Sequence, residues 1–185
     1  MRVIAGEFKS RRLVSLPGLE TRPTPDRLRE TLFSILQSRI EGCVFVDAYA
    51  GTGAVGIEAV SRGARLAILI ESNRNAVEVI RQNAESLKLG TRVRIVKGSA
   101  PACGKELESA DIVFADPPYT REREYENFME TLSAVTPPLS IVQHSVRFAL
   151  QEHYGPLIRT RVLKQGDNAL SFYALSDSSV VKTED

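Results

Sequence analysis

Residues 44–56 read Val-Phe-Val-Asp-Ala-Tyr-Ala-Gly-Thr-Gly-Ala-Val-Gly. The apolar beginning predicts a buried strand over 44–48, and the apolar residues at the other end predict a helix over 54–62. Between them, the glycines at 51, 53 and 56 satisfy the G-x-G-x-x-G pattern in the strand–loop–helix context that a nucleotide site requires. Glycine allows a tight turn and close approach of a ligand to the backbone. The stretch therefore predicts the first unit of a nucleotide-binding α/β fold.

Strands and helices continue to alternate after this unit. We expect strands at 66–71, 93–97, 111–115, 140–146, 157–164 and 169–175, and helices at 73–89, 100–107 and 123–135. A hairpin over 2–16 and a helix over 25–40 come before them. Alternation of this kind is typical of a mostly parallel sheet that binds ligands outside the carboxyl ends of its strands.

The domain organisation follows from length and pattern. With 185 residues, the chain has the size of one domain. We expect a basic extension over 1–40, a Rossmann-like core over 41–175, and a flexible polar tail over 176–185.

Two carboxylates flank the glycine loop. Glu71 ends the second predicted strand, twenty residues after Gly51, where a carboxylate can accept hydrogen bonds from ribose hydroxyls. This pairing indicates a cofactor that contains adenosine. Asp47 lies just before the loop, where a carboxylate disfavours a pyrophosphate and suits a cationic group such as the ammonium of S-adenosylmethionine. On the loop alone, an NAD-dependent oxidoreductase remains an alternative.

The tetrapeptide Asp116-Pro-Pro-Tyr119 follows the strand predicted over 111–115. Tandem prolines restrict the backbone and give a stiff loop. The Asp116 carboxylate and the Pro117 carbonyl offer two acceptors, which suit the two protons of an –NH2 group. Holding both protons orients the nitrogen lone pair for attack on an electrophilic methyl group. Pro118 stiffens the loop, and Tyr119 is expected to stack on a base that is unpaired or flipped out.

This tetrapeptide matches the [D/N]-P-P-[Y/F/W] signature of amino-group methyltransferases. The chain as a whole resembles the RsmD-like family of bacterial 16S rRNA guanine-N2 methyltransferases. The resemblance rests on residues 4–6, 10–13, 22–27, 29–33, 47–59, 61–64, 116–119, 154–155 and 171–173.

The resemblance implies a seven-stranded class I methyltransferase fold, S-adenosylmethionine as cofactor and guanine N2 of 16S rRNA as target. It places Asp47, Gly51, Gly53 and Glu71 at the cofactor, and residues 116–119 at the reaction centre. Many relatives carry Gly-Asp-Ala where this chain has Gly98-Ser99-Ala100, so adenine recognition is expected to rest on Ser99 or on backbone groups there. Relatives commonly carry Phe at the position of Tyr49.

Charge is distributed unevenly along the chain. Residues 1–40 hold eight Arg or Lys against four Asp or Glu, whereas the whole chain has a net charge of +1. A basic arm on a slightly acidic body suggests a polyanionic partner, although a solvated surface gives the same pattern. The predicted RNA contacts are Arg11, Arg12, Arg22 and Arg27. We expect the partner to be ribosomal RNA or an assembling small subunit, and the protein to be a monomer.

Other residue types exclude several classes of protein. Cys43 and Cys103 are too few for a disulfide framework and match no metal-ligand spacing, and neither His144 nor His153 has a ligand at metal spacing. We therefore expect reduced thiols and no metal. Without a signal peptide or an apolar run of about 20 residues, the sequence reads as cytoplasmic.

Three alternatives to an rRNA enzyme remain open besides the oxidoreductase. Amino-group methylation of DNA adenine or of protein glutamine uses a similar Pro-Pro loop. The short chain, with no separate recognition domain, argues against a sequence-reading DNA enzyme. An RNA-binding module without catalysis would share the basic arm.

Overall fold

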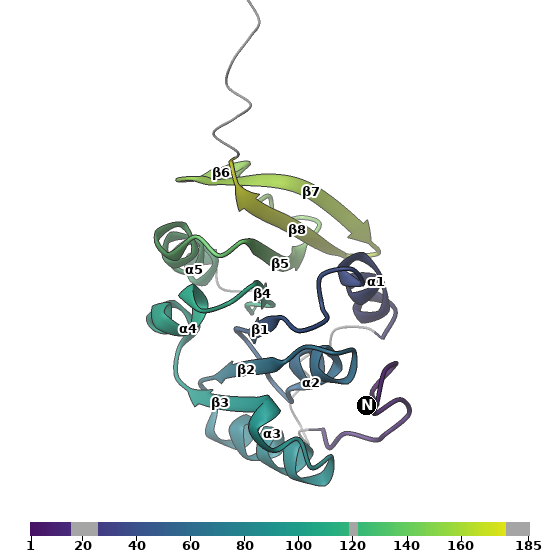
Figure 1. Ribbon diagram of the computed structural model, residues 1–185. Coiled ribbons are helices and arrows are strands. Elements are labelled where there is room, and N and C mark those ends of the chain that lie inside the picture. Colours follow the sequence, from purple (N-terminus) through teal and green to yellow (C-terminus); the bar gives the residue numbers. More distant parts are fainter. Residues whose placement is uncertain (16–25, 119–121, 177–185) are drawn as a thin grey trace, which may run out of the picture.

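The structure is a computed structural model that describes residues 1–15, 26–118 and 122–176. Its centre is an eight-stranded sheet in the order β3-β2-β1-β4-β5-β8-β7-β6 (Figure 1). The strands are β1 (Val44–Asp47), β2 (Leu66–Glu71), β3 (Val93–Lys97), β4 (Ile112–Ala115), β5 (Leu139–Ser145), β6 (His153–Tyr154), β7 (Leu157–Gln165) and β8 (Asn168–Leu175). Strands β1 to β5 pair in parallel, whereas β8, β7 and β6 add on as antiparallel strands.

The sheet confirms the α/β fold class, with one strand more than the seven expected. The additional strand, β6, has only two residues. An alternating pattern needs about four residues to be recognised. A strand of two residues therefore leaves no signal in the sequence.

Helices cover both faces of the sheet (Figure 1). The helical elements are α1 (Asp26–Leu36), α2 (Ala54–Ser61), α3 (Arg74–Ser86), α4 (Gly104–Glu108) and α5 (Glu122–Val135), with short 3-10 turns η1 (Gly90–Arg92) and η2 (Ala100–Ala102). Alternating side chains of β1 divide the core, because Val44 and Val46 pack with α4 and α5, and Phe45 packs with α1. Strands β1 and β4 are buried along their whole length.

Several predicted helices are shorter in the structure, and α3 covers Arg74–Ser86 where a helix over 73–89 was expected. Two of the other differences have a clear local cause. Helix α1 ends at Leu36 rather than at residue 40, because the chain turns there and the Arg39 N–H bonds the Leu36 carbonyl. The helix expected over 100–107 is divided into η2 and α4, since Pro101 lies in the first turn and Gly104 follows shortly after.

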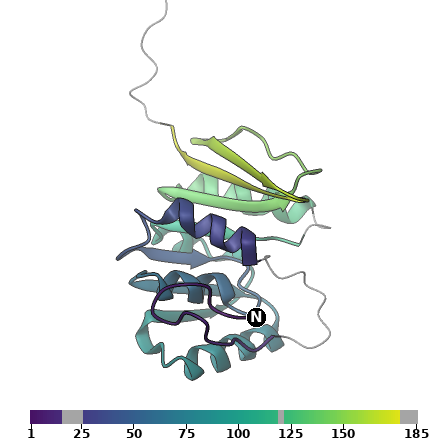
Figure 2. The same ribbon diagram turned by 90° about the vertical axis from the view of Figure 1, so that its right-hand side faces the viewer.

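The hairpin expected over 2–16 is reduced to a single antiparallel bridge between Arg2 and Arg12. Residues 1–3 and 10–13 still pair through three backbone hydrogen bonds. Residues 4, 5, 7 and 8 bond to helix α2 instead, which keeps the pairing short. The Ile4 and Ala5 N–H groups donate to the Glu58 carboxylate at 2.7 and 2.9 Å. Figure 2 shows the segment lying across α2, in front of the sheet. We call residues 1–15 the arm.

Candidate active site

Three carboxylates meet at the carboxyl edge of the sheet, as the sequence predicts. Asp47 ends β1 and is in register with Leu69 of β2 and Phe114 of β4. Glu71 ends β2, and Asp116 follows the last residue of β4. The chain continues from β1 to one side through β2 and β3 and later returns on the other side through β4. The acids therefore lie at the switch point of the sheet, where ligands bind in folds of this class.

The glycine loop takes backbone conformations that favour glycine. Gly51 has φ +54° and Gly53 has φ +79°, and Gly53 also begins helix α2. A Cβ on Gly51 would meet nothing within 4 Å, so this part of the backbone is open to a ligand. A Cβ on Gly56, by contrast, would come within 2.0 Å of the Leu69 side chain. The third glycine therefore serves close packing of α2 on β2, whereas the first lies beside open space.

Asp47 hydrogen-bonds the end of the glycine loop where helix α2 begins. Its carboxyl group is only 1% exposed and accepts a hydrogen bond of 3.0 Å from the Gly56 N–H, in the first turn of α2. Burial raises the pKa of Asp47 to about 7, a rise that the charge of Glu71 increases and the Gly56 hydrogen bond opposes. A nearby cationic ligand would stabilise the charged form, which fits the ammonium of S-adenosylmethionine.

We expect the substitution Asp47→Asn to stabilise the cofactor-free protein at pH 8. In the unfolded chain, Asp47 has its ordinary pKa of 3.8. Between about pH 4 and pH 7 the folded protein holds a proton that the unfolded chain has lost, so stability falls as pH rises through this range. The amide cannot ionise but still offers an oxygen to Gly56. Thermal melts should show Tm raised by about 5–10 °C at pH 8, from a gain of a few kcal/mol, and less change at pH 5. An equal change at both pH values would contradict this account.

Glu71 connects the loop to helix α3. Its carboxylate accepts from the Gly51 N–H at 2.8 Å and from the Asn73 N–H at 2.7 Å. Each carboxylate oxygen has a second lone pair, so both can also accept from ribose hydroxyls. The Gly51 and Asn73 N–H groups thus fix the position of the Glu71 carboxylate, as the binding of a ribose would require.

The segment expected to recognise adenine lies beside Glu71. The Gly98 N–H donates to the Glu71 carbonyl at 3.1 Å. Ser99 is exposed and begins the turn η2, and its side chain makes no capping hydrogen bond to it. Ala100 is buried beneath it. Ser99 therefore presents an exposed hydroxyl at this edge, while its carbonyl accepts from the Ala102 N–H.

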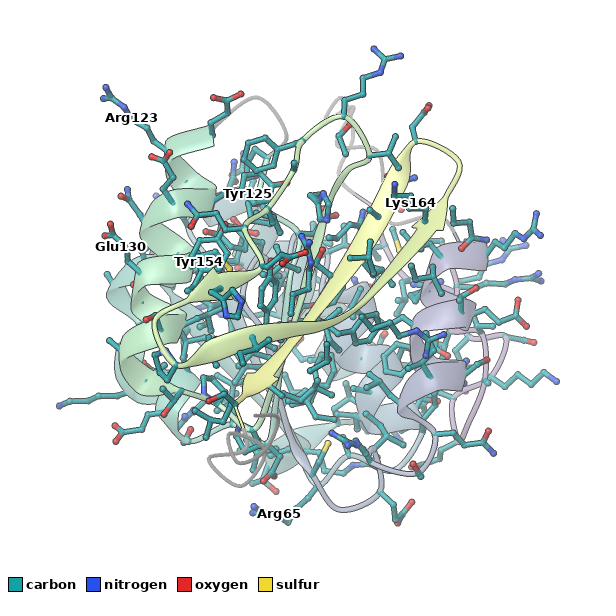
Figure 3. All side chains as sticks on the ribbon, turned by 90° about the horizontal axis from the view of Figure 1, so that it is seen from above. Arg65, Arg123, Tyr125, Glu130, Tyr154 and Lys164 are labelled. Atoms are coloured by element: carbon teal, nitrogen blue, oxygen red, sulfur yellow. The ribbon has the colours of Figure 1, made fainter. Side chains whose placement is uncertain are left out.

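The loop predicted to form the reaction centre leaves the sheet directly after β4. Asp116 is half-buried, Pro117 is buried and Pro118 is exposed. Tyr119, the predicted stacking residue, is outside the described residues. The Pro117 carbonyl accepts a hydrogen bond of 3.1 Å from the hydroxyl of Tyr125, which also lies 3.2 Å from the Gln143 carbonyl of β5. Figure 3 shows Tyr125 extending from α5 toward the sheet.

The sequence alone does not single out Tyr125, although its hydroxyl contacts the loop after β4. Tyr125 occurs at helical spacing with Phe128, Met129 and Leu132 and is 2% exposed, so it reads as an ordinary core residue. A phenol in such a position is a usable signal, because a buried hydroxyl needs a hydrogen-bond partner. A second missed contact joins Tyr49 to Glu124 on α5, with a hydroxyl-to-carboxylate distance of 2.9 Å. Burial and this carboxylate raise the pKa of Tyr49.

The predicted RNA contacts are only partly described. Arg11, Arg12 and Arg27 are exposed, and Arg22 is outside the described residues. Arg29, in contrast, is fully buried, and one of its terminal nitrogens donates to the Arg2 carbonyl at 2.7 Å. The basic segment therefore contains both solvent-facing charges and one internal anchor.

One histidine and both cysteines are buried, and burial shifts the pKa of each toward its neutral form: His144, Cys43 and Cys103. His144 is buried, with its Nε2 atom 2.8 Å from the Ser171 hydroxyl, and burial lowers its pKa. Burial raises the pKa of Cys43 to about 11 and also raises that of Cys103, which keeps both as thiols. Across residues 1–15, 26–118 and 122–176, no cluster of three or more His, Cys, Asp or Glu is placed to hold a metal. Within the same ranges, every helix is too short or too polar to cross a bilayer.

Comparison with known proteins gives consistent relatives. The family model “Conserved hypothetical protein 95” matches residues 1–174. “Putative rRNA methyltransferase YlbH” of Bacillus subtilis (strain 168) is 28% identical over 186 residues, which cover 94% of this chain and 98% of the relative. “Ribosomal RNA small subunit methyltransferase D” of Escherichia coli (strain K12) is 40% identical over 124 residues, covering 65% of this chain and 61% of that protein.

Solved structures agree with these relatives. “Putative methyltransferase yhhF from Escherichia coli” has a TM-score of 0.80 and 32% identity, and the match covers 95% of this chain and 98% of that one. An RNA methyltransferase from Salinibacter ruber, solved with S-adenosyl-L-homocysteine, has a TM-score of 0.65 at 14% identity and supports the shared fold. The match over residues 1–174 shows that the chain belongs to the “Conserved hypothetical protein 95” family, the RsmD-like methyltransferases, with a class I methyltransferase fold and S-adenosylmethionine as the expected cofactor.

Proposed function

We propose that this protein methylates the exocyclic N2 amino group of a guanine in 16S ribosomal RNA, using S-adenosylmethionine. The observation that carries the proposal is the Asp116–Pro117 corner at the switch point, beside the glycine loop. The names of the Bacillus and Escherichia relatives support rRNA as the substrate class. The target atom rests on the chemistry of the corner and on the family resemblance.

The corner suits an amino group because it presents two acceptors. We propose that the Asp116 carboxylate accepts a hydrogen bond from one N–H of the –NH2 group and that the Pro117 carbonyl accepts one from the other. These two bonds orient the nitrogen lone pair toward the methyl group. The cofactor, when bound, supplies a methyl group on a positively charged sulfur. As the nitrogen gains the methyl it must lose one proton, and Asp116 is the nearest proposed acceptor. Stacking of the guanine on Tyr119 would contribute about 1–3 kcal/mol.

We expect Tyr125→Phe to lower kcat by about tenfold while leaving KM for RNA within about twofold. The substitution removes the proton that ties the Pro117 carbonyl to the α5 side of the sheet, so the carbonyl loses its fixed direction. Loss of one buried hydrogen bond should cost only about 1 kcal/mol of stability. Steady-state methyl transfer with labelled cofactor measures both constants.

Tyr173→Phe is the matched control for this prediction. Tyr173 is also a buried tyrosine, and its hydroxyl donates to a carbonyl, that of Gln151, at 2.7 Å. It lies on β8 and does not touch the corner. If both variants reduce kcat equally, the effect comes from general loss of packing and the role of Tyr125 is refuted.

The exposed arginines of the arm and of α1 are proposed to bind RNA phosphates. Arg11, Arg12 and Arg27 would each add about 0.7 to the slope of log affinity against log salt for a single strand. The protein is proposed to act as a single methyltransferase unit on rRNA or on the assembling small subunit, and as a monomer.

The decisive experiment offers tritium-labelled cofactor with rRNA, small ribosomal subunits, DNA and protein extract as acceptors. Transfer to rRNA or subunits, followed by mass-spectrometric mapping of the methyl to guanine N2, is the expected result. Label in DNA adenine or in protein glutamine would replace the proposal with one of the related amino-group reactions. Identical rRNA modification in cells with and without this gene would exclude the ribosomal assignment.

A further inference from the structure

One buried side chain joins the cofactor loop to the arm. Asn83, on α3, is 0% exposed and donates from its Nδ2 to the Thr52 carbonyl, inside the glycine loop, at 3.0 Å. The same amide pairs with the backbone of Val14 in both directions. Its Oδ1 accepts from the Val14 N–H at 2.7 Å, and Nδ2 donates to the Val14 carbonyl at 3.2 Å.

The surroundings make this link stiff. Ile80, one turn earlier on α3, has its side chain 3.3 Å from where a Cβ on Gly53 would lie. Asn73, the N-cap of α3, donates its N–H to Glu71, and the other oxygen of Glu71 accepts from the Gly51 N–H. Both ends of α3 therefore contact the cofactor site, and the end that carries Asn83 also holds the arm.

The arm has other contacts with the body of the protein besides the Asn83 hydrogen bonds. Residues 4–8 are held on α2, where the Ser61 hydroxyl accepts from Phe8 and donates to Ala5. At the arm's first residue, the Thr52 hydroxyl lies 3.8 Å from the Met1 sulfur, a weak contact. Val3 and Leu13 of the arm share an apolar cluster with Ala50 and Ala54. Asn83 adds directed hydrogen bonds to both the Thr52 carbonyl of the loop and the Val14 backbone of the arm.

We propose that Asn83 couples cofactor binding to RNA binding. A ligand that fixes the Thr52 carbonyl also fixes the amide that holds Val14, and so orders the basic arm that meets the RNA. Coupling between two sites is reciprocal, so bound RNA tightens cofactor binding by the same factor. The inference rests on the proposed function only in taking RNA as the partner of the arm, and it assigns Asn83 as a positioning residue.

The test measures binding of S-adenosylhomocysteine by calorimetry, with and without small ribosomal subunits from cells lacking this gene. In the wild-type protein the subunits should tighten binding by at least about fivefold. In Asn83→Ala this factor should fall to about one. Ser61→Ala is the control, because it loosens the arm at α2 without contacting Thr52, and it should keep the wild-type factor.

A measurement on the wild-type protein avoids dependence on a variant that folds poorly. Binding of S-adenosylhomocysteine alone should slow amide hydrogen exchange at Val14 by at least about fivefold, with no change at Phe8. A coupling factor of one in wild type, an unchanged factor in folded Asn83→Ala, or unaltered exchange at Val14 each overturns the coupling. If subunits are bound and methylated without coupling, only this inference fails. If neither subunits nor free rRNA bind, the proposed function fails with it.

Discussion

Asp116→Ala is expected to lower kcat by about 10²–10³ while leaving the affinity for S-adenosylhomocysteine within about twofold. Removing one preorganised polar group aimed at the reacting atoms has effects of this size in other enzymes. The corner is rigid, because β4 is buried along its whole length and the loop continues through two prolines. Without the carboxylate, the amino group keeps one acceptor and its lone pair is no longer directed. Single-turnover methyl transfer at saturating cofactor measures the chemical step.

A carboxylate at the other end of the same strand gives the control. Asp111 precedes β4, and its Oδ2 accepts from the Val44 N–H at 2.7 Å. Asp111→Ala should reduce stability by about 1 kcal/mol and leave kcat within twofold. Retention of kcat within threefold in Asp116→Ala would show that the corner does not hold the reacting nitrogen.

The central sheet and its acids were largely predictable because they depend on local patterns. Strands β2 and β3 have the bounds expected from their apolar runs. Parallel strands place their carboxyl ends at one edge, so Asp47, Glu71 and Asp116 come together from sequence order alone. Glycine spacing and tandem proline also report directly on backbone conformation. Local sequence patterns therefore predict the edge at which these carboxylates meet.

Contacts between distant segments were not predictable in the same way. Asn83 bonds Val14 across 69 positions, and Glu58 bonds Ile4 across 54. On α3, Asn83 continues the buried stripe of Ala76 and Ile80. A polar residue in such a stripe indicates a buried hydrogen bond, but its partner is fixed only when the arm folds onto the body. The arm was for this reason expected to pair mainly with itself.

The second large effect concerns stability and falls on Glu58. This carboxylate is 0% exposed and accepts three hydrogen bonds, from the N–H groups of Ile4 and Ala5 and from Arg62 Nε at 2.8 Å. Burial lowers the pKa of Arg29, and the negative charge of Glu58 opposes this by favouring the charged form of Arg29. Arg62 in turn lies over the Phe33 ring, 5.0 Å from its centroid. One side chain thus unites the arm, α1 and α2.

We therefore expect Glu58→Ala to lower the free energy of unfolding by about 3–5 kcal/mol, because two arm N–H groups lose their acceptor and Arg62 loses its ion-pair partner. Buried Arg29 keeps its bonds to Asp26 and to the Arg2 carbonyl but loses a charge that favours its charged form. Glu58→Gln should cost less, since the amide oxygen can still accept from the arm. Urea denaturation gives both values, and Glu78→Ala is the control for an exposed pair: Glu78 meets Arg81 at 3.4 Å on the surface and should cost at most about 0.5 kcal/mol. A loss below about 1 kcal/mol in Glu58→Ala would mean that water replaces the carboxylate. The arm would then be held on the body by its other contacts, with Ser61 and Asn83.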